Sequence, residues 1–197
     1  VVVIDVKTGE ILAMASYPDF EPAKFDDNYS KLIKDAGKPM FNRAISGTYP
    51  PGSVFKMITA IAGLEEGVIS TSEKIRDEGQ YEYYGQKFNC WIWTQSHATH
   101  GLQNVSEAIE NSCNYYFYEV GRRLGEKRIY DYASKAGLGQ RTGLEIEGES
   151  EGVLANENYK KTTFDQVWYP GDTLQMAIGQ SFNLFTPIQI ANYIATV

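Results

Sequence analysis

Ser53 and Lys56 are the two residues of this sequence whose types and spacing are best suited to chemistry. A serine hydroxyl is a weak nucleophile until a base lies within hydrogen-bond reach, and a lysine amine can be that base when burial lowers its pKa. Residues 49–52 break regular structure, and apolar residues at helical spacing follow as far as residue 67, which predicts a helix with Ser53 at its N-terminus. Lys56 would then share a helix face with Ser53. Taken alone, the pair also fits an N-cap serine beside a solvent-exposed lysine.

A second group suited to chemistry contains every Cys and His of the chain, all between positions 90 and 113. Such clusters are typical of metal sites. A hairpin over residues 75–93 that turns near Tyr83 would bring an aspartate opposite the first cysteine. The sequence therefore predicts a closed, tetrahedral zinc site of the structural kind. Its ligands would be Asp77, Cys90, His100 and Cys113. His97 is the alternative fourth ligand, and a disulfide or two buried free thiols is the alternative to metal.

Residues 43–56, which read Arg-Ala-Ile-Ser-Gly-Thr-Tyr-Pro-Pro-Gly-Ser-Val-Phe-Lys, resemble the active-site segment of class B penicillin-binding proteins, the monofunctional D,D-transpeptidases. The wider group of penicilloyl-serine enzymes carries the motifs Ser-x-x-Lys, Ser-x-Asn and Lys-Thr-Gly. Ser53 and Lys56 match the first motif, and Ser112-Cys113-Asn114, at the junction of two predicted helices, matches the second. The resemblance covers nearly the whole chain and implies an α+β, β-lactamase-like fold with an antiparallel sheet flanked by helices.

The resemblance also implies a reaction and a role for each motif residue. Ser53 would attack the D-alanyl-D-alanine ends of peptidoglycan stem peptides, with Lys56 as its base. Ser112 would relay a proton to the leaving amine, and Asn114 would bind the substrate amide. The acyl-enzyme would cross-link the cell wall, and β-lactams would acylate the same serine. No cofactor is needed for this chemistry, and a structural zinc ion would fix the loop that carries the second motif.

The family context adds expectations about the setting of the parent protein. By resemblance it is anchored in the bacterial cytoplasmic membrane and faces outward. It would act in elongation, division or sporulation, with cell-wall synthesis partners such as a glycosyltransferase. A β-lactam sensor domain and a non-catalytic cell-wall scaffold are the competing interpretations.

The third motif is the main departure from the family pattern. Lys7-Thr8-Gly9 spells it, but this tripeptide precedes Ser53 and lies in a predicted hairpin turn. Ser181-Phe182-Asn183 spells the second motif again, but its flanks resemble a structural segment of the family. We therefore expect residues 1–197 to be one transpeptidase domain, cut at both ends, that lacks the strand with Lys-Thr-Gly.

The elements that must position these residues can be read from patterning. Residues 1–5 and 11–16 predict an antiparallel hairpin, and the Gly-containing hairpin at 75–93 is the second. Residues 17–42 predict an excursion with a helix near 28–36. Further helices are expected at 104–110, 114–124, 126–136 and 188–197, whereas 139–154 and 156–170 read as loops. Strands do not alternate regularly with helices, which favours α+β over a doubly wound sheet.

Composition narrows the function classes. The 197 residues are 43% apolar, enough for a substantial core. The net charge of -7 and the lack of a basic stripe argue against nucleic-acid binding, which relies on clustered Lys and Arg. No apolar run reaches the length that a bilayer crossing needs.

Overall fold

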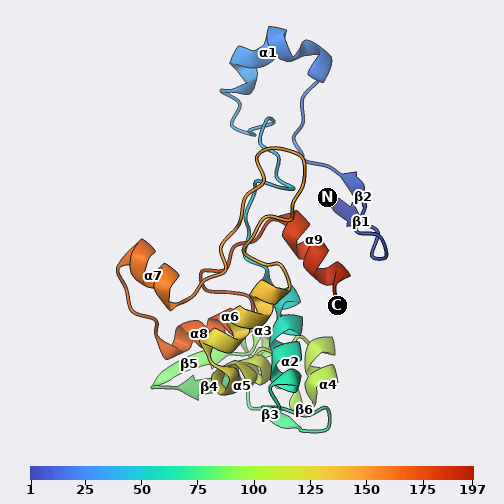
Figure 1. Cartoon of the computed structure of the whole chain (residues 1–197). Helices are drawn as coiled ribbons and strands as arrows, with labels where there is room; N and C mark the ends of the chain where they lie inside the picture. The colour runs from blue at the N-terminus through green and yellow to red at the C-terminus, as the bar shows by residue number, and fades with distance from the viewer. The chain divides into compact units, whose positions relative to one another are not determined.

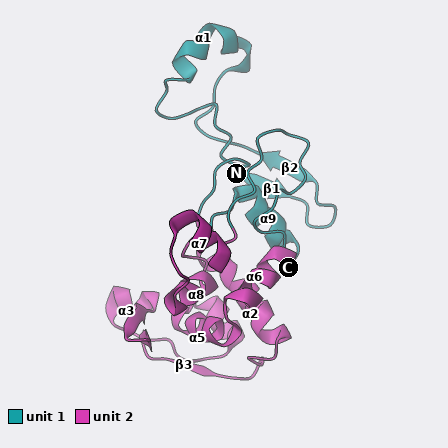
Figure 2. Ribbon diagram, turned by 60° about the vertical axis from the view of Figure 1, so that its left-hand side comes forward, with its two compact units in different colours: residues 1–49, 136–153, 184–197 teal, residues 50–135, 154–183 magenta.

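The computed structural model describes all residues from Val1 to Val197. They form two compact units, coloured separately in Figure 2. Unit 1 consists of residues 1–49, 136–153 and 184–197, and unit 2 of residues 50–135 and 154–183. Each unit is described by itself.

Unit 1 is built on the first predicted hairpin, which is confirmed. β1 (Val2–Ile4) pairs antiparallel with β2 (Ile11–Met14). Asp5 closes the connection, because its carboxylate accepts hydrogen bonds from the backbone N–H groups of Lys7 and Thr8. The tripeptide that spells Lys-Thr-Gly is therefore part of a turn.

The core of unit 1 lies between this hairpin and α9 (Pro187–Ala195). α9 starts one residue before its predicted position because Thr186 caps it. The buried residues Ala44, Ile45 and Ile188 form the centre of the core. The predicted helix at 28–36 lies earlier than expected, at α1 (Phe25–Leu32). A 3-10 turn, η1 (Pro22–Lys24), leads into it with proline at its first position, where a missing N–H costs nothing.

Unit 2 is organised around α5 (Asn114–Leu124), which has the predicted bounds. α5 contacts α2 (Lys56–Glu65), α6 (Glu126–Lys135) and α8 (Pro170–Ala177), as Figure 1 shows. Glycines allow the closest approaches. A Cβ on Gly63 would lie 2.9 Å from Val120, and a Cβ on Gly121 would lie 2.5 Å from the Cβ of Ala177. The helices can therefore pack this closely only while both positions lack a side chain.

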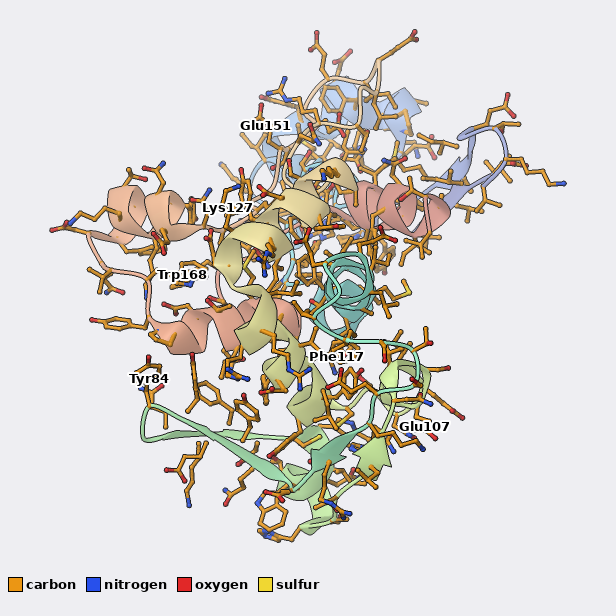
Figure 3. The ribbon with its side chains drawn as sticks, turned by 60° about the horizontal axis from the view of Figure 1, so that its bottom comes forward. Tyr84, Glu107, Phe117, Lys127, Glu151 and Trp168 are labelled. Carbon is orange, nitrogen blue, oxygen red and sulfur yellow. The ribbon has the colours of Figure 1, made fainter.

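The strands of unit 2 differ from the predicted long hairpin. The hairpin is shorter, with β4 (Gln80–Tyr83) paired to β5 (Gln86–Asn89). Tyr84 lies at its tip (Figure 3), and both Tyr84 and Gly85 have the positive φ values of a tight hairpin turn. β3 (Ile75–Asp77) instead pairs with the more distant β6 (Gly101–Gln103), so Asp77 lies opposite Gly101.

The remaining segments of unit 2 include two helices that the sequence did not predict. Trp91–Ser96 form α3 directly after the hairpin, and Glu157–Phe164 form α7 where a loop was expected. α7 has little apolar periodicity. It begins after Asn156, whose side chain accepts a hydrogen bond from the N–H of Tyr159, and its buried Lys160 pairs with Asp172 at 2.6 Å. α4 (Val105–Glu110) begins after Asn104, whose cap is completed by a capping box with Glu107; Ser106, the other possible cap in the sequence, lies inside the helix.

The helices and small antiparallel sheets confirm the predicted α+β class. None of the helices has both the length and the hydropathy needed to cross a bilayer.

Candidate active site

The Ser53 turn is more tightly wound than the predicted α-helix. Gly52–Phe55 form a 3-10 turn, η2, and the α-helical part begins at Lys56. Residues three apart lie one above the other in a 3-10 turn, so Ser53 and Lys56 are on the same side as predicted. The backbone N–H of Gly52 donates to the carbonyl of Gly179 at 2.9 Å. A Cβ on Gly179 would lie 2.1 Å from the Gly52 oxygen, so this close approach requires glycine.

Ser112 lies in a strained position at the end of α4. Its own N–H bonds to the carbonyl of Ile109, and the N–H of Cys113 bonds to that of Ala108, which is the Schellman pattern. The residue between them must be left-handed, and glycine usually fills this place. Here Ser112 has φ 49°. A side chain kept at a strained backbone position is typical of functional sites.

Four polar side chains meet at this junction. The hydroxyl of Ser112 donates to Ser53 Oγ at 2.9 Å. Lys56 Nζ lies 3.0 Å from Ser112 Oγ and 2.7 Å from the Ser112 carbonyl oxygen. Asn114 Oδ1 accepts a third hydrogen bond from the amine at 2.6 Å. The structure thus brings all four predicted residues together, and Ser112 lies between the amine and the Ser53 hydroxyl.

Lys56 is buried, with 2% of its surface exposed. Burial disfavours the charged amine and lowers its pKa to about 8, although the nearby Cys113 and Cys90 oppose the shift. An amine with this pKa is neutral in a substantial fraction of molecules near neutral pH. The arrangement can therefore remove a proton from a hydroxyl.

Ser53, Ser112 and Asn114 line a cavity of about 430 Å³, and Lys56 lies buried behind them. The lining of the cavity consists of Ser53, Trp91, Ser112, Asn114, Tyr118, Gln175, Ile178 and Gln180. Gln175 in the last turn of α8 and Gln180 just after it have no sequence motif that marks them as site residues. Trp91, the residue after Cys90, also lines the cavity.

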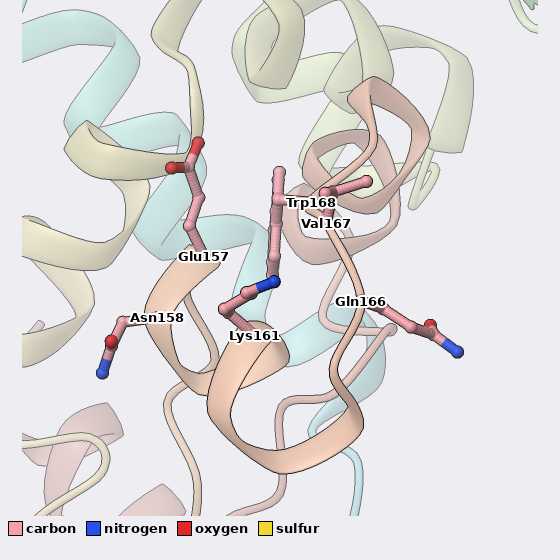
Figure 4. A pocket seen from close by; sticks show the side chains of 6 residues that line it. All are labelled: Glu157, Asn158, Lys161, Gln166, Val167 and Trp168. Carbon is pink, nitrogen blue, oxygen red and sulfur yellow. The ribbon is translucent and has the colours of Figure 1, made fainter.

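A second cavity, of about 460 Å³, lies beside α7 (Figure 4). It is lined by Glu157, Asn158, Lys161, Gln166, Val167 and Trp168. None of the predicted site residues is among them. The smaller cavity is therefore the candidate active site, because three of the predicted site residues line it and the fourth, Lys56, contacts two of them.

The predicted metal ligands also come together. Ligand atoms of Asp77, Cys90, His100 and Cys113 all lie within 4.8 Å of one another. The two sulfur atoms are 4.0 Å apart, and both cysteines are free. His100 Nδ1 lies 2.7 Å from Asp77 Oδ2 and 3.6 Å from Cys90 Sγ. The pairing of β3 with β6 places Asp77 beside the other donors, whereas the predicted hairpin would have placed it opposite Cys90.

Hydrogen bonds and burial control the charge of this cluster. Burial alone would raise the pKa of Asp77, but N–H groups of His100 and Gly79 donate to its carboxylate, and the pKa lies below its usual value. The hydrogen bond from Cys113 lowers the pKa of Cys90, and the pKa of Cys113 is raised by the same bond and by burial.

The donor set fits a zinc ion. Two sulfurs, one imidazole and one carboxylate are ligands that tetrahedral zinc takes, and bonds of about 2.0–2.3 Å require donors roughly 3.3–3.8 Å apart. Two contacts of 3.6 Å, between Cys90 and His100 and between Cys113 and Asp77, have this spacing. The 2.7 Å hydrogen bond between His100 and Asp77 would have to lengthen when both bind an ion, and the two sulfurs, 4.0 Å apart, would have to approach slightly. His97 is not among the donors. It ends α3 in a left-handed conformation, is exposed, and packs on Trp93.

A family comparison identifies the class of the domain. The profile of the penicillin-binding protein transpeptidase domain matches residues 1–197. The chain belongs to this family. The predicted family is therefore confirmed, and with it the fold class of the transpeptidase domain.

The similar transpeptidases are longer than this chain. The peptidoglycan D,D-transpeptidase MrdA of Acinetobacter baumannii is 37% identical over 97% of the chain and 29% of its own length. The solved complex of PBP2 with MreC from Helicobacter pylori has 33% identity and a TM-score of 0.92, over 98% of this chain and 36% of that one. A peptidoglycan synthase complex that coordinates polymerization and crosslinking has 38% identity and a TM-score of 0.88, over 99% and 34%. The chain thus spans about a third of the proteins it matches.

Proposed function

We propose that this transpeptidase domain acts as a peptidoglycan D,D-transpeptidase that forms an acyl-enzyme on Ser53. The observation that carries the proposal is the contact series from Lys56 Nζ through Ser112 Oγ to Ser53 Oγ, at 3.0 and 2.9 Å. A nucleophile, a hydroxyl relay and a buried amine with a lowered pKa are the parts that serine acyl transfer needs. The names of the curated relatives agree with this reaction.

The acylation step uses Lys56 as the base. The neutral amine takes the Ser53 proton by way of the Ser112 hydroxyl, whose rotation can reverse the direction of its hydrogen bond. Ser53 Oγ then attacks the carbonyl carbon of the penultimate D-alanine. The peptide C–N bond breaks, and the leaving amine of the terminal D-alanine receives the proton through Ser112. Asn114 Oδ1 holds Lys56 in place, and we assign the amide nitrogen of Asn114 to the donor peptide.

The second step returns Ser53 to its starting state. An amine of a neighbouring stem peptide attacks the ester carbonyl, and the Ser53 ester bond breaks as the new peptide bond forms. The acceptor's proton passes back to Ser53. A β-lactam would enter by the same attack and remain as an ester on Ser53, because its amide nitrogen stays attached to the acyl group.

We also assign a structural zinc ion to the cluster of Asp77, Cys90, His100 and Cys113. Bound there, zinc would supply cross-linking of the fold and no chemistry at the peptide. Cys113 stands between Ser112 and Asn114 in the sequence and caps α5 through its sulfur, which accepts from the N–H of Tyr116. These donors would therefore hold the junction that presents both motif residues.

The setting of the whole protein follows from its relatives. We propose an anchor in the bacterial cytoplasmic membrane, an outward-facing domain and a peptidoglycan polymerase as partner. The similar complexes, one with MreC and one that couples polymerization to crosslinking, support this choice.

Intact-mass spectrometry of the full-length protein after incubation with a penicillin tests the reaction. The expected result is one adduct per chain, absent in Ser53→Ala. Ser181→Ala is a matched control because it changes the serine of the second Ser-x-Asn sequence. No adduct on folded wild-type protein would favour the non-catalytic scaffold, and an adduct retained in Ser53→Ala would exclude Ser53 as the nucleophile.

A further inference from the structure

Trp91 contacts both groups of functional residues. It is the first residue of α3, directly after Cys90, and it is 43% exposed. Its indole ring packs against the ring of His100, with centroids 5.6 Å apart and planes tilted by 56°. It also lines the cavity that contains Ser53.

The indole is fixed on the active-site side as well. Trp91 Nε1 donates to the carbonyl oxygen of Asn111 at 3.1 Å. Asn111 is the C-cap of α4 and immediately precedes Ser112. The ring is thus held between a residue of the donor cluster and the backbone that leads into the strained serine.

The state of the His100 ring can change how strongly it interacts with Trp91. Its Nδ1 faces the other donors, and its Nε2 is buried without a hydrogen-bond partner. When Nδ1 is a ligand, Nε2 carries the ring proton, and the imidazole gains positive character. An aromatic face is a favourable neighbour for such a ring. The aromatic neighbour here is the tilted ring of Trp91.

Most of the other side chains that line the Ser53 cavity are polar or are buried from solvent. The cavity has two aromatic side chains, and Tyr118 is only 3% exposed. Trp91 is therefore the aromatic surface on which the methyl group and peptide plane of an acyl donor can rest.

We propose that Trp91 is a positioning residue that couples the donor cluster to the acyl-donor pocket: ligation of His100 fixes the indole, and the indole forms the pocket wall. This inference rests on the proposed function. It adds a specificity-determining residue and a physical connection between the metal group and the reacting serine.

The first test uses saturation kinetics of Ser53 acylation by a fluorescent penicillin on the full-length protein. Trp91→Ala is expected to raise the half-saturating concentration by about tenfold, with a smaller change in the limiting rate. Trp91→Phe keeps a ring on His100 and should stay within about threefold of wild type. Trp93→Phe is the matched control, because Trp93 lies in the same helix but packs on Gly79 and His97.

The second test measures the visible absorption of a metal ion bound to the donor cluster. Co²⁺ replaces zinc at such donor sets and reports changes around its ligands in its visible absorption. Penicillin acylation of the Co²⁺-loaded protein should shift these bands in wild type and in Trp93→Phe, but not in Trp91→Ala. A shift that persists in Trp91→Ala, or wild-type kinetics in that variant, overturns the coupling. A protein that binds no Co²⁺ overturns it too. If the wild-type protein is not acylated, both the proposed function and the coupling are wrong. If it is acylated normally but the bands do not shift, only the coupling is wrong.

Discussion

Ser112 and Gly179 occupy the same position of the same helix-ending motif, one after α4 and the other after α8. In both places the next residue donates five residues back, from Cys113 to Ala108 and from Gln180 to Gln175. Both residues are left-handed, with φ 49° and 74°. The glycine adopts this conformation without strain, whereas the serine does not.

Replacing Ser112 with glycine should therefore separate stability from activity. Ser112→Gly removes a left-handed side chain and should leave the free energy of unfolding unchanged or raise it by up to about 1 kcal/mol. It also removes the hydroxyl between Lys56 and Ser53, so the acylation rate should fall by about 10²- to 10⁴-fold. Ser112→Ala should lose the same activity without the gain in stability. Chemical denaturation and penicillin acylation kinetics measure the two effects, and acylation at the wild-type rate in Ser112→Gly would contradict the relay.

The lowered pKa of Lys56 predicts the pH dependence of acylation. The neutral amine is the base, so the second-order rate constant should rise with pH and level off above about 8. Lys56→Met should lose this rise together with most of the activity. Stopped-flow measurements of acylation from about pH 6 to about pH 10 give this profile, because the lowered pKa of Lys56 lies near the centre of this range and the ordinary pKa of lysine lies near its upper end. A flat profile in wild type would mean that another group accepts the proton.

The same shift predicts how stability changes with pH. Below about pH 8 the native and unfolded states both carry the Lys56 proton, so the full cost of burying the charge is present. Between about 8 and the ordinary 10.5, the native state releases the proton first, and stability rises with pH. Relative to Lys56→Met, the wild type should gain about 3 kcal/mol at most over this interval. Denaturation curves of both proteins at each pH measure the difference, and a constant difference would contradict the assignment.

Metal analysis tests the donor cluster. The purified protein should hold one zinc ion per chain, and chelation should lower the free energy of unfolding by at least about 2 kcal/mol. Cys90→Ser should bind far less zinc. His97→Ala is the control, because His97 lies outside the donor group and should leave the zinc content unchanged. Full zinc content in Cys90→Ser, or a disulfide mapped between the two cysteines of the native protein, would contradict the zinc site.

The close approach of α5 and α8 predicts a stability effect with a specific rescue. The new methyl group of Gly121→Ala would lie 2.5 Å from the Cβ of Ala177, so the variant should lose about 1–3 kcal/mol. Adding Ala177→Gly removes the clash and should recover part of this loss, giving a coupling between the two sites. Denaturation of the single and double variants measures the coupling. Additive effects would mean that the helices relax apart.

The parts of the fold that the sequence predicts well are those with local causes. α5 has the predicted bounds because Cys113 caps its start and Gly125 follows its last residue. Asn104 predicts the start of α4 in the same way. The nucleophile and its partners are also local signals, since their spacing and flanking residues are enough to place them at helix starts and junctions.

The features that the sequence did not predict have distant causes. β3 pairs with β6, across the whole hairpin of β4 and β5. α7 contains one partner of the ion pair between Lys160 and Asp172, but Asp172 lies outside the helix and cannot be paired with it from local sequence alone. The place of Trp91 in the cavity follows from its hydrogen bond to Asn111, twenty positions along the chain. Such contacts are set by tertiary packing and leave little trace in periodicity.

The hydrogen bond from Thr59 Oγ1 to the Ala177 carbonyl, 2.7 Å long, joins residues 118 positions apart in sequence. It lies beside the backbone contact of Gly52 with Gly179. The metal donors, by contrast, all lie between positions 77 and 113. Contacts close in sequence form early in folding, and distant ones must wait for loop closure. On the ribosome, the donor cluster could therefore form before α8 is synthesised, while the turn of the nucleophile must wait for it. If Ser53 reacts with a penicillin as proposed, that reaction should therefore appear only after α8 has packed against the Ser53 turn.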